Sequence, residues 1–138
     1  MSNSSTPDTS PGSKDATPLG LATEDLGSAL VVHVAGEIDM NTSPALRDHL
    51  AGVFAKALTT PVENRPTLVV DLGDVTFLAS IGLSVLVANH HDAAAGNIPM
   101  LVVVSSRAVR RSIAAAQLDR LLTLHPTVED ALSTVPAR

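Results

Sequence analysis

The side chain with the clearest potential for chemistry is the hydroxyl of Ser80. It lies in residues 69–83, VVDLGDVTFLASIGL, where an apolar strand is predicted to pass through a turn into a helix that the serine opens. Unpaired backbone N–H groups and the positive end of the dipole surround a hydroxyl at a helix N-terminus, so a phosphate there would be accommodated. The position therefore favours a phosphorylation switch. From position alone, the alternative is a serine that only caps the helix.

A second group of polar side chains follows another apolar strand. Asp39 ends residues 31–39 and precedes Asn41 and Thr42. A carboxylate in this place readily accepts hydrogen bonds from local backbone, which predicts a turn or a helix cap. Further along the chain, Asp74 is more typical of a turn former than of a catalytic acid, whereas the role of Asp71 at a strand end stays open.

Other residues with reactive or charged side chains have simpler interpretations. Arg107, Arg110 and Arg111 form a solvated basic surface of one predicted helix or, alternatively, contact an acidic partner. The run His90-His91-Asp92 is not expected to bind metal, because adjacent helical residues point about 100° apart. The sequence around Ser80 lacks the G-x-S-x-G pattern of a nucleophile elbow, and no glycine-rich phosphate loop is present. Catalysis is therefore not expected.

Apolar periodicity predicts the elements that position these residues. Strands are predicted at residues 19–23, 29–35, 67–71, 100–104 and 121–124. Helices are predicted from Thr42 or Ser43 to 58, at 82–95, from Ser105 or Ser106 to about 115, and at 127–132. The later strands and helices alternate, which is typical of an α/β fold with parallel pairing.

Composition limits the class of protein further. The 138 residues are 45% hydrophobic with two Phe, no Trp and no Tyr, which predicts a single domain with an aliphatic core. A net charge of −5 argues against nucleic acid as a partner, and the absence of Cys excludes disulfide and zinc-thiolate sites. Residues 1–18 are rich in Ser, Thr and Pro and are predicted to be a disordered tail before a domain at 19–138. With no signal or membrane-spanning segment apparent, a cytoplasmic protein is expected.

Three stretches resemble the STAS-domain family of anti-sigma factor antagonists. Residues 74–83, DVTFLASIGL, match its central signature, and the phosphorylated serine of the family falls on Ser80. Residues 31–39 resemble the strand that ends in Gly-Glu-[ILV]-Asp, and residues 106–111 resemble the late [SP]-x-x-V-x-[KR] helix. Two positions depart from the pattern: Ala79 stands where many members carry Asp, and Ile81 where many carry Ser or Thr.

The resemblance implies a fold, a partner and a site. The implied fold is a mixed β-sheet of about four to five strands with about four helices packed on it. The implied function is binding of a serine-kinase-type anti-sigma factor, which frees a sigma factor until the kinase phosphorylates Ser80. The implied partner-binding residues are Asp39, Asn41, Thr42, Ala79, Ser80, Ile81, Gly82 and Leu83. Core packing is the alternative for Ile81 and, more strongly, for Leu83.

The remaining expectations concern partners and mechanism. A phosphatase is a further expected partner, and the protein is expected to be a monomer or weak dimer that needs no cofactor. Because Ala79 departs from the signature, a second function stays open: a STAS regulatory subunit of a transporter or stress-signalling scaffold that docks without phosphorylation.

Overall fold

The computed structural model describes residues 18–136, and the predicted disordered tail lies outside these residues except for Pro18. The strands are β1 (Gly20–Asp25), β2 (Ala29–Ile38), β3 (Thr67–Leu78), β4 (Met100–Val103) and β5 (Thr123–His125). The helices are α1 (Ser43–Leu58), α2 (Ser80–Ala95), α3 (Arg107–Ala115) and α4 (Val128–Leu132), with short 3-10 helices η2 (Val62–Asn64) and η3 (Leu118–Arg120). Every predicted helix is present with similar bounds.

The strands form one mixed sheet in the order β1-β2-β3-β4-β5. The edge strand β1 is antiparallel to β2, whereas β2, β3, β4 and β5 pair in parallel. Parallel neighbours need a crossover, and α1, α2 and α3 provide these connections along the chain. The predicted α/β fold, with its mixed sheet and four helices, is confirmed.

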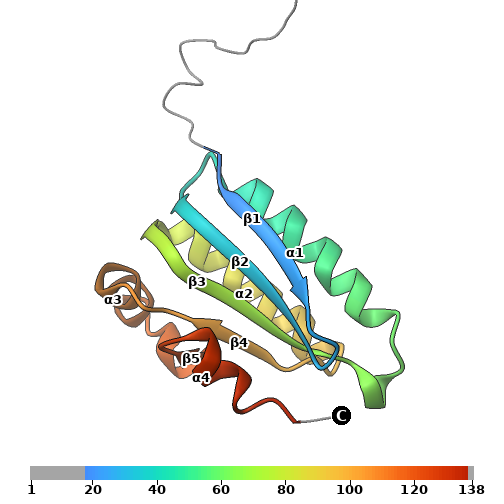
Figure 1. Ribbon diagram of the computed structural model, residues 1–138. Coiled ribbons are helices and arrows are strands. Elements are labelled where there is room, and N and C mark those ends of the chain that lie inside the picture. The colour runs from blue at the N-terminus through green and yellow to red at the C-terminus, as the bar shows by residue number, and fades with distance from the viewer. Residues whose placement is uncertain (1–17, 137–138) are drawn as a thin grey trace, which may run out of the picture.

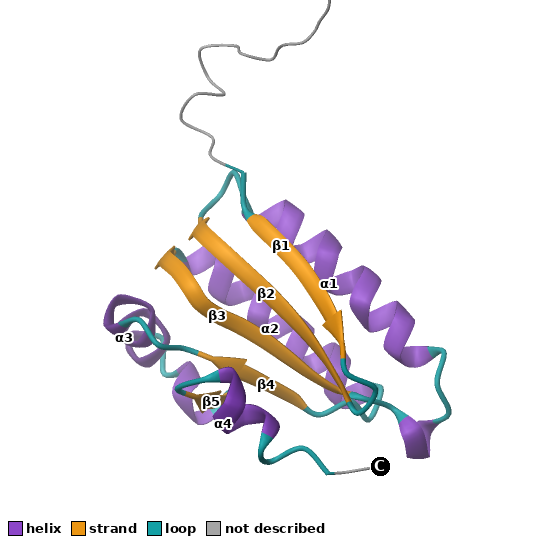
Figure 2. Ribbon diagram, viewed as in Figure 1, coloured by secondary structure: helices purple, strands orange, loops and turns teal. Residues whose placement is uncertain are grey.

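Helices cover both faces of the sheet (Figure 2). Helices α1 and α2 lie on one face, where Leu46, Leu50 and Leu86 join the larger apolar core. Helix α4 lies on the other face (Figure 1), where Ala131 packs with Val31, Val69 and Val103 in a smaller cluster. The large core thus fixes α1 and α2 relative to the ends of β2 and β3.

One predicted feature is wrong: β3 does not end near Asp71 and turn toward Ser80. The strand continues to Leu78, and Asp74 lies within it opposite Ala35 of β2. Two register shifts, between His33 and Ala35 and between Gly36 and Glu37, absorb the extra residues of β3. Leu72, Val75 and Leu78 stay buried along this stretch, so core burial outweighs the turn preference of Gly73 and Asp74.

His33 joins three neighbouring strands through its ring. Its Nδ1 lies 2.8 Å from Oδ2 of Asp71 on β3, and its Nε2 lies 3.1 Å from Oε1 of Glu24 on β1. The hydrogen bond to Glu24, followed by the one to Asp71, raises the pKa of His33 above its usual value. Asp71, whose role the sequence left open, therefore supports the sheet.

Candidate functional site

Ser80 is the first residue of α2 and is exposed to solvent. The N-cap position belongs to Ala79, whose backbone is extended and whose side chain makes no capping hydrogen bond. The Ser80 hydroxyl makes no hydrogen bond to any group within residues 18–136. The capping alternative for Ser80 is therefore wrong, and its hydroxyl is available to react at the positive end of a 16-residue helix.

The loop after β2 is shaped by Asp39 and Thr42. Oδ1 of Asp39 accepts hydrogen bonds from the backbone N–H groups of Asn41 and Thr42, at 2.9 and 3.0 Å. The Thr42 hydroxyl donates to the Glu37 carbonyl at 2.7 Å and accepts from the Asp39 N–H at 2.9 Å. The predicted turn role of Asp39 is confirmed, whereas its predicted role as a helix cap is wrong, because Thr42 is the N-cap residue of α1 and no side chain caps that helix. Asp39 is half-buried and Asn41 exposed, whereas Thr42 is buried.

The loop and the start of α2 meet at one end of the sheet. The Ala79 N–H donates to the carbonyl of Ile38 at 2.9 Å, which ties the residue before Ser80 to the residue before Asp39. The structure thus brings the two predicted segments together. They adjoin because β2 and β3 pair in parallel, so that both strands end at the same edge.

The other residues assigned to partner binding fall into two groups. Ile81 is 43% exposed, whereas Leu83 is 9% exposed and belongs to the core, as its alternative assignment favoured. Gly82 is buried, and a Cβ built there would lie 2.5 Å from Cγ2 of Ile38. Gly82 and Leu83 therefore hold the first turn of α2 against the sheet. Ser80 and Ile81 are exposed to solvent, and Ala79 is half-buried beside them.

Sequence reasoning missed two apolar side chains at this end of the sheet. Met40 is 78% exposed in the loop after β2, and Phe77 is 50% exposed near the end of β3, opposite Glu37. Met40, Phe77, Ser80 and Ile81 are hereafter called the Ser80 surface. Phe77 could have been found from its outward place between buried Val75 and Leu78, had β3 been extended to Leu78.

Three acidic side chains lie on the elements that lead to this end of the sheet. Glu37 is exposed near the end of β2, Asp74 is exposed within the second half of β3, and Asp39 is half-buried in the loop between β2 and α1. These carboxylates add local negative charge to a chain whose net charge is already −5. A positively charged partner surface would complement them.

The arginines of α3 and the histidine pair singled out from the sequence lie on other parts of the molecule. Arg107 and Arg111 are exposed on α3, and Nη2 of Arg110 donates to the Val104 carbonyl at 3.2 Å. His90 and His91 touch edge to face with ring centroids 5.7 Å apart. Within residues 18–136, no group of three or more His, Cys, Asp or Glu side chains could hold a metal ion.

Comparisons with known proteins identify the family. The family model of the STAS domain matches residues 21–131, and this chain belongs to that family. The chain is 33% identical over 111 residues to the anti-sigma-F factor antagonist RsfB of Mycobacterium tuberculosis, covering 80% of this chain and 84% of the relative. It is also 33% identical to RsfA, another anti-sigma-F factor antagonist of that organism, over 77% of this chain and 79% of the relative.

A solved structure supports the same assignment. The crystal structure of an anti-sigma factor antagonist from Mycobacterium paratuberculosis superposes with a TM-score of 0.74 and 38% sequence identity, covering 85% of this chain and 93% of that chain. The resemblance to STAS-domain anti-sigma factor antagonists, stated from the sequence, is confirmed. In residues 18–136, moreover, every helix is too short or too polar to cross a membrane.

Proposed function

We propose that this protein is an anti-sigma factor antagonist whose partner is a serine-kinase-type anti-sigma factor and whose binding is switched off by phosphorylation of Ser80. The observation that carries the proposal is the exposed, unbonded hydroxyl of Ser80 at the start of α2. The relatives named anti-sigma-F factor antagonists support the class of partner. Binding sequesters the anti-sigma factor and leaves its sigma factor free for transcription.

The Ser80 surface supplies the docking contacts in this proposal. Met40, Phe77 and Ile81 expose apolar area at the end of the sheet where α2 begins, and such residues are the usual anchors of an interface. Asp39, Asn41 and Ala79 contribute the polar edge and backbone beside it. Thr42, Gly82 and Leu83 are buried and contribute indirectly, because they keep the loop and the start of α2 in place. The acidic rim steers a basic partner, so association should slow as salt concentration rises.

Phosphorylation would act on binding rather than on the fold. A phosphate adds about −1.5 to −2 charges at pH 7, and the N-terminus of α2 tolerates negative charge. Ser80 is exposed, so the isolated domain has room for the group. In a close interface, the same group would be desolvated against a surface shaped for a hydroxyl and would lie near the acidic rim. A loss of about 3 kcal/mol lowers affinity roughly a hundredfold.

The test is calorimetric titration of the kinase-type anti-sigma factors encoded in the same genome with wild type and Ser80 variants. Ser80→Ala should bind as wild type does, and Ser80→Glu should bind roughly a hundredfold more weakly. Ser133→Glu is the matched control, because Ser133 is exposed after α4, on the opposite face from α2. Equal affinity of Ser80→Glu and Ser133→Glu would refute the switch.

Ala79 is the observation that favours a second candidate function, in which Ser80 is not phosphorylated. It occupies the position where many family members carry Asp, directly before the serine. A STAS regulatory subunit of a transporter or stress-signalling scaffold would dock through the same surface without being phosphorylated. Incubation with kinase and ATP separates the two functions, since this second candidate requires that Ser80 stay unmodified.

A further inference from the structure

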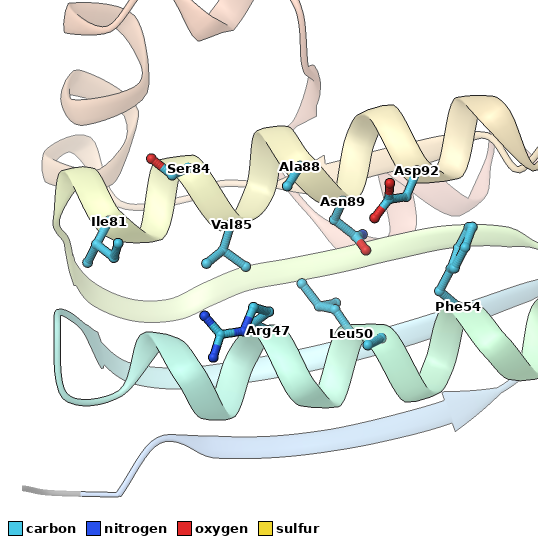
Figure 3. A pocket seen from close by; sticks show the side chains of 10 residues that line it. Arg47, Leu50, Phe54, Ile81, Ser84, Val85, Ala88, Asn89 and Asp92 are labelled. Atoms are coloured by element: carbon cyan, nitrogen blue, oxygen red, sulfur yellow. The ribbon is translucent and has the colours of Figure 1, made fainter.

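A groove separates the outer surfaces of α1 and α2 (Figure 3). It has a volume of about 370 Å³, and its apolar floor and walls include Leu50, Phe54, Ile81 and Val85. Small residues, Ala51 on α1 and Ala88 on α2, leave it open to solvent. An open apolar groove between two helices is a shape that accepts an amphipathic helix.

Asn89 places a polar side chain in the lining of this groove. The residue is only 7% exposed, and its Nδ2 donates to Sδ of Met100 at 3.4 Å, which fixes the orientation of the amide. No group in residues 18–136 donates a hydrogen bond to its Oδ1. Figure 3 shows the Asn89 amide and, one turn later, the Asp92 carboxylate projecting from α2 toward α1. Both oxygens are acceptors, so this end of the groove is suited to a cationic N–H donor.

The opposite end of the groove carries positive charge. Arg47 lies there near Ile81 and Val85. Its Nε forms a long ion pair with Oδ1 of Asp48, at 3.8 Å. The N-termini of α1 and α2 lie at this same end and add the positive ends of their dipoles. The groove is therefore electrically polar along its length, with Arg47 at one end and Asp92 at the other.

We infer that the groove binds an amphipathic helix of the anti-sigma factor, with a Lys or Arg side chain at Asn89 and Asp92 and an acidic side chain at Arg47. The aliphatic stem of that basic residue would pack on Phe54, whose ring also offers a cation–π contact. Arg47 and Phe54 are seven residues apart on α1, which corresponds to about 10 Å along the axis. The bound helix should therefore carry its two charged anchors about two turns apart.

This inference rests on the proposed function, because Ile81 belongs both to the Ser80 surface and to the groove. A partner seated over Ser80 reaches the groove directly, without crossing another element. The experiment therefore uses the kinase-type anti-sigma factor that binds wild type. If no such factor binds wild type, both proposals fail; if one binds and the groove variants behave as wild type, only the groove inference fails.

The first test fills the groove. Ala51→Trp should weaken binding of the anti-sigma factor at least tenfold, because its ring occupies the space meant for the partner helix. Ala95→Trp is the control, since Ala95 is an exposed alanine of α2 outside the groove and should bind within twofold of wild type. Circular dichroism melting verifies that both variants fold. Ala51→Trp binding within twofold of wild type would overturn the inference.

The second test reverses the charge at one end. Asp92→Lys should weaken binding about tenfold, whereas Asp119→Lys, the same charge change at an exposed site on η3, should weaken it less than threefold. Equal losses for the two variants would show that net charge alone is responsible and would contradict the groove.

The third test identifies the occupant. The chain has no cysteine, so Ala51→Cys gives a single attachment point for a photo-crosslinker. Crosslinking should capture a helical, Lys- or Arg-containing peptide of the anti-sigma factor, and Ala95→Cys should not capture that peptide. Crosslinks only to non-helical segments, or equal crosslinking from both positions, would overturn the inference.

Discussion

Gly82 is the position where a single added methyl group tests the geometry beneath Ser80. A Cβ at this position would lie 2.5 Å from Cγ2 of Ile38 and 2.7 Å from Cδ1 of Leu78. Carbon atoms pack best at about 3.5–4.0 Å, so α2 or the strand ends must move by roughly 1 Å. Ile38 and Leu78 are 0% and 3% exposed and have little room to yield.

The expected cost of Gly82→Ala follows from two opposing effects. Overpacking in a core costs about 1–3 kcal/mol, while replacing Gly by Ala in a helix gains up to about 1 kcal/mol. We therefore expect Gly82→Ala to lower the free energy of unfolding by about 1–2 kcal/mol. The displaced first turn should also weaken binding of the anti-sigma factor, because Ser80 and Ile81 move with it.

Urea denaturation followed by circular dichroism measures the effect. The midpoint for Gly82→Ala should fall by roughly 0.5–1 M urea. Gly52→Ala is the matched control, since a Cβ at Gly52 of α1 meets nothing within 4 Å. For that variant, the free energy of unfolding should rise by about 0.5–1 kcal/mol, because alanine reduces the backbone entropy of the unfolded chain. A Gly82→Ala midpoint equal to or above that of wild type would refute the close packing of α2 on Ile38.

Three further expectations can be checked in the same way. The pKa of His33 is raised in the folded state. The stabilisation that protonated His33 gives is therefore complete below the unfolded pKa of about 6.5 and is lost as pH rises through the folded pKa. His33→Gln should remove this dependence of stability on pH from urea midpoints measured across that range. Asp39→Asn should keep the turn but weaken anti-sigma factor binding, whereas Asp39→Ala should also lower the melting temperature; normal binding of the well-folded Asn variant would leave Asp39 only a structural role. Deletion of residues 1–17 should leave melting temperature and binding nearly unchanged, and a drop of many degrees would show that the segment packs on the domain.

Most of the fold could be predicted because it depends on local periodicity. Leu46, Leu50 and Val53 recur at helical spacing, and all three are buried in α1. The exception is β3, where Gly73 and Asp74 have turn-forming side chains but lie within a strand. Asp74 pairs with Ala35 of β2, which lies more than 30 residues earlier in the chain, and Gly73 lies at the register shift beside this pair. Local preference carries no information about such a partner.

The site could be predicted only in part for the same physical reason. Ser80, Asp39 and Ile81 were found from motifs, since each stands at a strand or helix end. Met40 and Phe77 were missed because their exposure depends on how the strand ends and the loop are covered by other elements. The groove depends on the packing of α1 against α2, and the contact between His33 and Asp71 depends on strand register. Neither arrangement follows from spacing within one segment.

Reconstituted transcription tests the central claim most directly. RNA polymerase, the sigma factor and its kinase-type anti-sigma factor are combined, and transcript is measured after this protein is added. Wild type and Ser80→Ala should both restore transcription, and prior incubation with kinase and ATP should add one phosphate and abolish the effect for wild type alone. If wild type fails to restore transcription, or if ATP treatment leaves its activity and mass unchanged, the antagonist controlled by Ser80 phosphorylation is contradicted.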